Sequence, residues 1–388
     1  MSDALLPTPQ EWKQLLTPFV SCFTKPQFNN FSQATTAMAT SQYSSINRWA
    51  VLAGKHQSTL NDFFTFSPWD DAKVHSQLSR ITSRRVKDAY VGIIDDTLSH
   101  KPYAKKMEHA SWFYDGLTKK EQHGHSIVTH GLHSQELGFV PFDEQLYKKD
   151  GRSKNDIACS MIRRTKRYIK PRLYAVDSWY SNDQVLNTIR AQGSHYVTEI
   201  KSNRNATIAS KRRFVREHEQ HIKNKQWIVA KIKESTYRYF QTSAFITCLG
   251  NINLVFSQKY DDDEKKWTET YYIITDIQSL RGERVIELFL LRGGIEGFHR
   301  ESKQQLGLED YQLRNSRGIE RYLFLVLLVY VLLLLLCQRQ MRESFERKTV
   351  GELREHLKAE CYTTLLQQAK RKSREELEQI SKKLAFAL

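Results

Sequence analysis

The amino-acid sequence predicts an α/β fold in which a mixed sheet is flanked by helices. Between residues 86 and 200, short runs of apolar and β-branched residues alternate with segments of helical periodicity. A stretch rich in strand patterns follows at residues 201–270, and both ends of the chain have helical patterns. Strands that alternate with helices in this way are typical of a mixed sheet rather than a sandwich or a helical bundle.

Residues 1–85 predict a helical N-terminal domain. Apolar residues recur at helical spacing in the segments PTPQEWKQLLTPFVSCF, SSINRWAVLAG and STLNDFFTF. A helix-turn-helix can be drawn through this region, but a plain helical bundle is the simpler interpretation.

Residues 86–200 predict a sheet that begins with three strands, AYVGIID, HSIVTHGL and LGFVPFDEQLY. A helix at residues 155–169 follows, with Ser153 or Asn155 as its N-cap, and then the strand RLYAVD. A second helix, which Gly193 ends, leads into the strand HYVTEI.

Residues 201–270 predict a β-rich insertion that begins with a polar, basic run. The next strand pattern, TYYIITD, is a candidate to rejoin the main sheet. From Glu283 the chain is helical in pattern to near its end, and its last part, residues 341–388, is amphipathic and rich in charges.

The overall charge favours a polyanionic partner, either nucleic acid or an anionic membrane surface. The formal net charge is +16 and the pI is about 9.5. The five cysteines form no C-x-x-C pair, so neither a zinc ribbon nor a disulfide framework is indicated, and the odd count fits a reducing compartment. The N-terminus lacks the pattern of a secretory signal.

One segment, YLFLVLLVYVLLLLLC at residues 322–337, is apolar throughout. Such a helix is either a membrane span or a buried core helix. Its 16 residues are fewer than the roughly 20 that a span needs, and the chain has no second such segment. We therefore favour a core helix over the alternative, a basic membrane-anchored protein.

Acidic residues stand at the ends of two predicted strands and at the start of a helix. Asp95 and Asp96 end one strand, Asp177 ends another, and Glu296 opens a helix. A carboxylate at the end of an apolar strand needs a partner, and several together form an oxygen-rich site suited to Mg²⁺. Such a set can hold two metals about 3.5 to 4 Å apart, the arrangement for phosphodiester chemistry.

The segment around Glu296 carries cations on the same helical face. On one continuous helix, Arg292 lies one turn before Glu296, while Phe289 and Lys303 lie two turns before and after it. The opposite stripe is apolar, so one face packs into the core while the other presents an acid to metal and cations to phosphates. The glycines Gly293, Gly294 and Gly297 indicate a helix start or a close backbone approach.

These motifs resemble those of bacterial insertion-sequence transposases of the DDE type. The signature is the order F-x-x-R-x-x-x-E-x-x-x-x-x-x-K from Phe289 to Lys303, although the family usually has Tyr at the first position. IIDDT resembles the family's first acidic motif and AVDSWYSN its second. The family aligns its acid with the residue before Thr, which favours Asp96 over Asp95.

The resemblance, over residues 85–340, implies a ribonuclease-H-like core at residues 86–200 and 271–340, interrupted by the insertion. Asp96, Asp177 and Glu296 would bind Mg²⁺, with Mn²⁺ able to substitute. The N-terminal domain would bind transposon ends, and the tail at residues 341–388 would dimerise or contact DNA. The implied protein acts as a homodimer on double-stranded DNA in the bacterial cytoplasm near the nucleoid, with no small-molecule substrate and no membrane.

Several further residues are candidates for DNA contact or metal binding. Arg292, Lys303, Arg300 and His299 would hold phosphates beside the acids, and the resemblance makes Trp227 and Trp267 candidates to support a flipped base. The basic run with Lys211, Arg212, Arg213 and Arg216 is also a phosphate-binding candidate. His123, His125, His130 and His133 lack cysteine partners, so we favour ordinary histidines over a zinc site. A catalytically idle DNA-binding descendant of such an enzyme is the first alternative.

Overall fold

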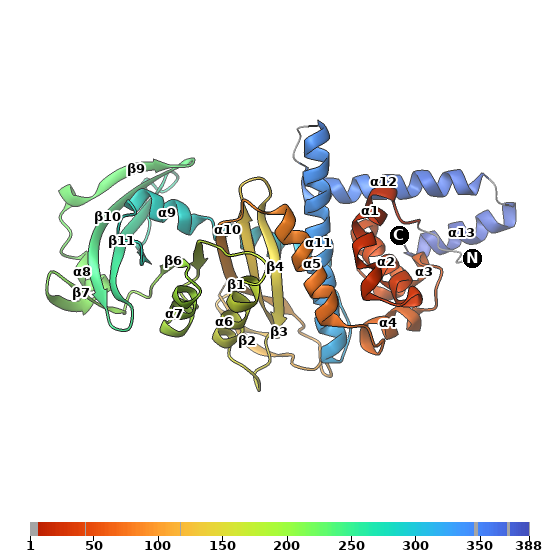
Figure 1. Cartoon of the computed structure of the whole chain (residues 1–388), viewed down its shortest axis with the longest axis horizontal. Helices are drawn as coiled ribbons and strands as arrows, with labels where there is room; N and C mark the ends of the chain where they lie inside the picture. The colour runs from red at the N-terminus through yellow and green to blue at the C-terminus, as the bar shows by residue number, and fades with distance from the viewer. Residues whose placement is uncertain (1–6, 43, 117, 345–347, 371–372, 388) are drawn as a thin grey trace.

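The structure is a computed structural model that describes the chain except for residues 1–6, 43, 117, 345–347, 371–372 and 388. Its parts follow one another along the long axis of the molecule (Figure 1). The β-rich insertion lies at one end, the main sheet lies in the middle, and the N-terminal helices and the C-terminal helices lie together at the other end. The predicted fold class is confirmed.

The N-terminal part is a helical bundle with an aromatic core. Its core contains the fully buried Trp12, Phe31 and Trp49. A capping box at Thr24 starts the second helix, and Asp70 caps the last one by accepting from Lys73 N at 3.1 Å. Its elements are α1 (Gln10–Leu16), η1 (Thr17–Cys22), α2 (Lys25–Thr40), α3 (Ile46–Leu52), α4 (Gln57–Thr65) and α5 (Asp71–Arg85).

The main sheet combines an antiparallel half with a parallel half. On one side of β3 lies β1, and on the other side lie β2 and β4; all three pair with β3 in the antiparallel direction. β1, β5 and β6 run parallel to one another. β2 was not predicted. The strands are β1 (Val91–His100), β2 (Ser111–Asp115), β3 (Lys120–Ser134), β4 (Gly138–Leu146), β5 (Leu173–Val176) and β6 (His195–Glu199). The helices α6 (Lys154–Thr165) and α7 (Asp183–Ala191) connect β4, β5 and β6, and Ser153 caps α6.

The insertion continues the same sheet beyond β6. Among the described residues, the strand order is β2-β3-β1-β5-β6-β13-β11-β10-β7-β8. β13 (Tyr271–Thr275) pairs with both β6 and β11, so the strand TYYIITD does rejoin the main sheet. The remaining elements are β7 (Asn205–Ile208), β8 (Lys211–Phe214), α8 (Val215–Glu219), η2 (Asn224–Gln226), β9 (Ile228–Ile232), β10 (Ser235–Ile246), β11 (Gly250–Asp261) and β12 (Lys266–Trp267).

The helix that carries the acid signature begins at its glycines. The sequence predicted a helix start or a close backbone approach there, and α9 (Gly282–Leu290) does end before α10 (Gly293–Gln305) begins. Phe289 and Arg292 therefore precede the helix of Glu296, instead of lying on one continuous helix with it. Two successive glycines at the start of α10 weaken helix continuity. Gly294 is also a point of close approach, because a Cβ there would lie 2.9 Å from the Cβ of Phe139 on β4. The chain ends in α11 (Ser316–Ser344), α12 (Val350–Ala369) and α13 (Arg374–Ala387).

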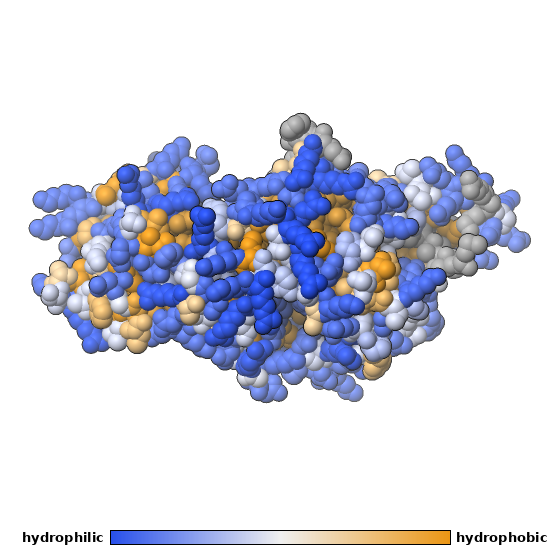
Figure 2. Space-filling model, viewed as in Figure 1, coloured by the Kyte–Doolittle hydropathy of each residue, from blue (hydrophilic) through white to orange (hydrophobic). Residues whose placement is uncertain are grey.

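The long apolar helix α11 is buried inside the protein. By length and composition it could cross a membrane, but 94% of its most apolar window is buried. Val329 and Leu333, near its middle, have no exposed surface. The surface in Figure 2 is mostly hydrophilic, with hydrophobic side chains in small groups. The segment at residues 322–337 is therefore the core helix that the sequence predicted.

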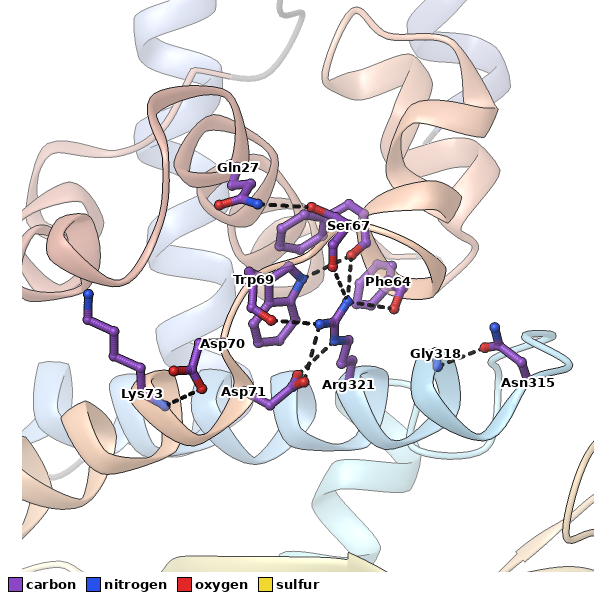
Figure 3. Close-up of polar contacts among 11 residues, drawn as sticks. Gln27, Phe64, Ser67, Trp69, Asp70, Asp71, Lys73, Asn315, Gly318 and Arg321 are labelled. Atoms are coloured by element: carbon purple, nitrogen blue, oxygen red, sulfur yellow. Dashed lines mark hydrogen bonds and ion pairs between the residues drawn. The ribbon is translucent and has the colours of Figure 1, made fainter.

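Arg321 of α11 ties this helix to the N-terminal bundle (Figure 3). Its guanidinium forms two hydrogen bonds with Asp71, at 2.7 and 3.2 Å, and is only 2% exposed. It also donates to backbone carbonyls of the bundle, at 2.8 Å for both Ser67 and Trp69, and lies 4.0 Å from the Trp69 ring centroid. A buried charge that is satisfied in this way fixes one element against the other.

Candidate active site

Three carboxylates follow the parallel strands at one edge of the sheet. Ile94 of β1 is aligned with Val176 of β5, which is aligned in turn with Thr198 of β6. The next residues along each strand are Asp95, Asp177 and Glu199. Because parallel strands present their carboxyl ends at the same edge, the three acids are neighbours there. Sequence reasoning missed Glu199, although the strand HYVTEI carries it at the same position.

Arg292 lies among these acids, in the short connection between α9 and α10. Its guanidinium is 3.4 Å from Asp95 Oδ2, 3.7 Å from Asp177 Oδ1 and 3.4 Å from Glu296 Oε1. Glu296 stands in the first turn of α10 with 59% of its side chain exposed. The structure therefore places Asp177 and Glu296 around one guanidinium, with Asp95 rather than the favoured Asp96 as the third acid there.

The electrostatics of the cluster show an excess of negative charge. Burial is the main reason that the pKa of Asp95 rises to about 7, and the neighbouring Asp96 and Asp177 raise it further, while Arg292 opposes the rise. The pKa of Glu199 is also raised, first by burial and then by Asp177. Additional positive charge at this edge would relieve the repulsion.

Asp96 points to the other side of the sheet from Asp95, as successive residues of a strand do. Its carboxylate accepts hydrogen bonds from Lys154 Nζ at 2.6 Å, Tyr180 Oη at 3.0 Å and Ser126 Oγ at 3.2 Å. The two neighbouring acids therefore have different partners. Asp95 is paired with Arg292, whereas Asp96 is held by Lys154 of α6 and by Tyr180 of the loop before α7.

A divalent cation fits this group by the chemistry of its donors. The side chains offer carboxylate oxygens, which Mg²⁺ and Mn²⁺ prefer, and they already converge on the positive charge of Arg292. Among the described residues, these acids do not have all their ligand atoms within 4.8 Å of one another. Shared coordination requires side-chain rotation, which the exposure of Glu296 allows.

The other cations of the signature differ in how they are engaged. Lys303 Nζ donates to the carbonyl of Leu98 at 2.7 Å and lies 2.9 Å from Glu309 Oε1. Arg300 is exposed on α10. Phe289, 6% exposed, places its ring 5.6 Å from the Arg292 guanidinium. An aromatic ring at this distance orients a guanidinium without needing a hydroxyl group.

The prediction that His299 contacts DNA is wrong. Its side chain is 7% exposed, and its Nε2 lies 3.1 Å from Thr129 Oγ1 on β3. Burial, reinforced by the nearby Lys303, lowers the pKa of His299 to about 3, so the ring is neutral. His299 belongs to the face of α10 that packs on the sheet.

The basic run of the insertion lies far from the acids along the sheet. The strand β8, which is last in the strand order of the sheet, carries Lys211, Arg212 and Arg213. Four strands, β13, β11, β10 and β7, separate it from β6. Lys211 and Arg212 are exposed, whereas Arg213 is half-buried and contacts His221 at 2.6 Å.

The two tryptophans of the insertion pack on the same arginine. The guanidinium of Arg238 lies 4.9 Å from the Trp227 ring centroid and 4.8 Å from that of Trp267. Arg238 Nε also donates to Gln258 at 2.6 Å. Both rings are half-buried and lie against Arg238 in this structure, so a base that stacked on the same face of either ring would have to displace this arginine.

Three of the four histidines of the main sheet have hydrogen-bonding partners other than one another. His125 bonds to Tyr311 Oη at 2.8 Å and to the Glu108 carbonyl at 2.9 Å, and His130 lies 3.1 Å from Thr165 Oγ1. His123 lies 2.8 Å from the Lys101 carbonyl. Within the described part of the chain, the group whose ligand atoms come together is Glu11, His356 and Glu360, which includes none of them.

The structure thus combines a mixed sheet that carries acids at one edge with a helix, α10, that brings a further acid to them. A family model described as "Transposase DDE domain" matches residues 87–332, so the chain belongs to the DDE transposase family.

A solved structure supports the same fold. The chain is similar to a piggyBac transposase, described as "Cryo-EM structure of piggyBac transposase synaptic complex with hairpin DNA", with a TM-score of 0.52 and 9% sequence identity. The alignment covers 93% of this chain and 76% of that one. No curated protein sequence matches the chain.

Proposed function

We propose that the protein binds the inverted-repeat ends of a bacterial insertion sequence, cleaves DNA there and joins the 3′-hydroxyl ends to target DNA. The observation that carries the proposal is the convergence of Asp95, Asp177 and Glu296 on Arg292 in a member of the DDE transposase family. A bacterial cytoplasmic setting near the nucleoid, and a homodimer on the DNA, are parts of the same proposal.

Asp96, Asp177 and Glu296 are the proposed ligands for two Mg²⁺ ions, and Mn²⁺ would serve in their place. Such ions activate the attacking water or 3′-hydroxyl group and stabilise the leaving oxygen. The motif favours Asp96, while Asp95 is the acid beside Arg292. Asp96 points to the other side of the sheet from Asp95, where Lys154 and Tyr180 hold it. A ligand role for Asp96 therefore requires it to leave these partners and turn toward the acids beside Arg292.

Arg292 and Lys303 are the proposed phosphate contacts beside the cleaved bond. Arg292 can bind a phosphate through two parallel donors, whereas Lys303 acts as a point charge. Phe289 supports Arg292 through its ring, which accounts for the tolerance of Phe where the family usually has Tyr. Once DNA arrives, Lys303 would exchange its contact with Glu309 for a phosphate.

The test is Mg²⁺-dependent cleavage of a duplex that carries the terminal repeat bracketing the reading frame. Asp177→Asn and Glu296→Gln should abolish cleavage while leaving binding intact. Glu287→Gln is the control, because Glu287 is an acid on α9 that pairs with Arg284 outside the cluster. Cleavage by either active-site variant at the wild-type rate would remove that residue from the mechanism.

A second comparison tests the phosphate contacts and the activity itself. Arg292→Lys should remain impaired because the second donor is lost, whereas Lys303→Arg should be partly tolerated. A wild-type protein that binds the repeat but never cuts in Mg²⁺ or Mn²⁺ would instead identify a catalytically idle DNA-binding protein.

A further inference from the structure

A groove of about 1230 Å³ separates the N-terminal bundle from the end of the main sheet. One wall comes from the start of α3 and from α4 of the bundle. The other wall comes from two loops, residues 100–107 after β1 and residues 309–314 before α11. No function assigned so far uses this groove.

The groove begins where the catalytic helix ends. α10 runs beside β1, since Arg292 near its start contacts Asp95 and Lys303 near its end contacts Leu98. Lys303 then contacts Glu309, and Glu309 accepts from the backbone N–H of His100 at 3.3 Å. His100 and Glu309 both line the groove. A continuous set of contacts therefore leads from the acids into it.

The side chains that line the groove carry mainly positive charge. Lys105, Lys106 and Arg314 are exposed, and Arg48 is half-buried on the opposite wall. Two acids also line the groove: Glu309, which lies 3.2 Å from His100 Nδ1 as well as close to Lys303, and the exposed Asp310. Lys101 is different, because its ammonium is buried and donates to the carbonyls of Glu309 and Tyr311, which joins the two loops. The groove therefore presents exposed basic side chains from two loops that Lys101 holds together.

Tyr103 stands at the groove with 92% of its surface exposed. An exposed aromatic ring between basic residues is the combination by which proteins hold single-stranded nucleic acid: the cations follow the backbone and the ring stacks on a base. The distance from the acids to the groove also suits a DNA strand. Lys303, beside the groove, lies about 10 Å along α10 from Glu296, and about three nucleotides of a strand span that length.

We propose that this groove binds the DNA strand that continues beyond the cleaved bond, with Lys105 and Lys106 on its phosphates and an unstacked base on Tyr103. The inference rests on the proposed function, because that function places the scissile phosphate at the acids. It adds the path of the strand and the residues that hold it.

The first test measures affinity for a blunt duplex of arbitrary sequence and for the same duplex with a single-stranded 3′ extension. For the extended duplex, the double variant Lys105→Ala/Lys106→Ala should reduce the slope of log affinity against log salt by about 1.4, since each contact to a single strand contributes about 0.7. The matched control is Lys166→Ala/Lys170→Ala, two exposed lysines at the opposite edge of the sheet, near the start of β5.

The second test concerns the ring of Tyr103. Tyr103→Ala should weaken binding of the extended duplex by about 5- to 150-fold, the range of one base–aromatic stack. Tyr103→Phe should bind like the wild type because it keeps the ring. A photo-crosslinking amino acid at position 103 should react with the extension, at least about three nucleotides from the duplex end.

The outcomes separate this inference from the proposed function. Unchanged salt slope and affinity in the Lys105/Lys106 and Tyr103 variants, together with normal cleavage, would overturn the groove assignment alone. Equal wild-type affinity for blunt and extended duplexes would also overturn it, because the extension would then contribute nothing. A wild-type protein that bound neither of these duplexes, nor a duplex carrying the terminal repeat, would refute the proposed function as well.

Discussion

Replacing Asp95 by Asn should stabilise the protein at alkaline pH. The pKa of Asp95 is raised to about 7, chiefly by burial, with Asp96 and Asp177 adding repulsion. Between pH 3.8, the ordinary value, and about 7, the folded protein keeps this proton while the unfolded chain loses it. The folded state binds more protons in that window, so stability falls as pH rises through it. Asn carries no charge at any pH and is free of this loss.

The magnitude follows from the size of the shift. A change from 3.8 to about 7 is about 3 units, which at about 1.4 kcal/mol per unit corresponds to about 4 kcal/mol. Local relaxation and entry of water reduce this value, so the expected gain is about 2 to 4 kcal/mol at pH 8. At pH 4 the wild-type carboxyl is largely protonated, and the two proteins should have similar stability.

The assay is urea unfolding in metal-free buffer at several pH values, with Asp96→Asn as the matched neighbour. Asp96→Asn should be destabilising at pH 8, by about 1 to 3 kcal/mol, because it removes a charged acceptor from Lys154 and Tyr180. Equal effects of the two substitutions, or an Asp95→Asn protein no more stable than the wild type at pH 8, would refute the account of this edge of the sheet.

Three further substitutions test the packing. Arg321→Ala should lower the free energy of unfolding by about 3 to 5 kcal/mol, because Asp71 and several carbonyls lose their donor; a loss below about 1 kcal/mol would contradict that role. Val329→Asp should yield insoluble protein, since the site is fully buried; recovery of wild-type chain only in detergent would support the membrane alternative instead. Gly124→Ala should destabilise the protein by about 1 to 3 kcal/mol, because its Cβ would lie 2.1 Å from the Ser99 carbonyl oxygen; an unchanged melting temperature would show that β1 and β3 can separate.

The order of the helices and strands, and the acids at the strand ends, were predictable because each is marked by a few consecutive residues in the sequence. The strands around Asp95, Asp177 and TYYIITD are short apolar runs bounded by polar residues, and such runs are specified within the strand itself. β2 was missed because its sequence, SWFYD, has three aromatic residues in a row and no alternation of polar and apolar residues. Exposure does alternate in the structure: Trp112 and Tyr114 are 58% and 69% exposed, whereas Asp115 is buried.

What sequence reasoning missed depends on contacts between distant segments. His299 lies three residues from Glu296, and only the position of β3 decides that it faces Thr129 rather than solvent. The pairing of Trp227 and Trp267 on Arg238 likewise requires β10 and β12 to meet across β11. The choice between Asp95 and Asp96 was left open by the strand pattern, and the structure adds that their partners lie on opposite faces.

The placement of α11 has a consequence for how the chain matures during synthesis. Helices α1, α2, α4 and α5 all contact α11, and α2 also contacts α12, although some 230 residues separate the bundle from α11 in sequence. A nascent chain on the ribosome must therefore carry an incomplete N-terminal bundle until Arg321 and its neighbours emerge. A chain that stopped before residue 316 would leave apolar surface of the bundle exposed to solvent. We therefore expect proteases to degrade such a truncated chain, which would not persist as a folded DNA-binding fragment.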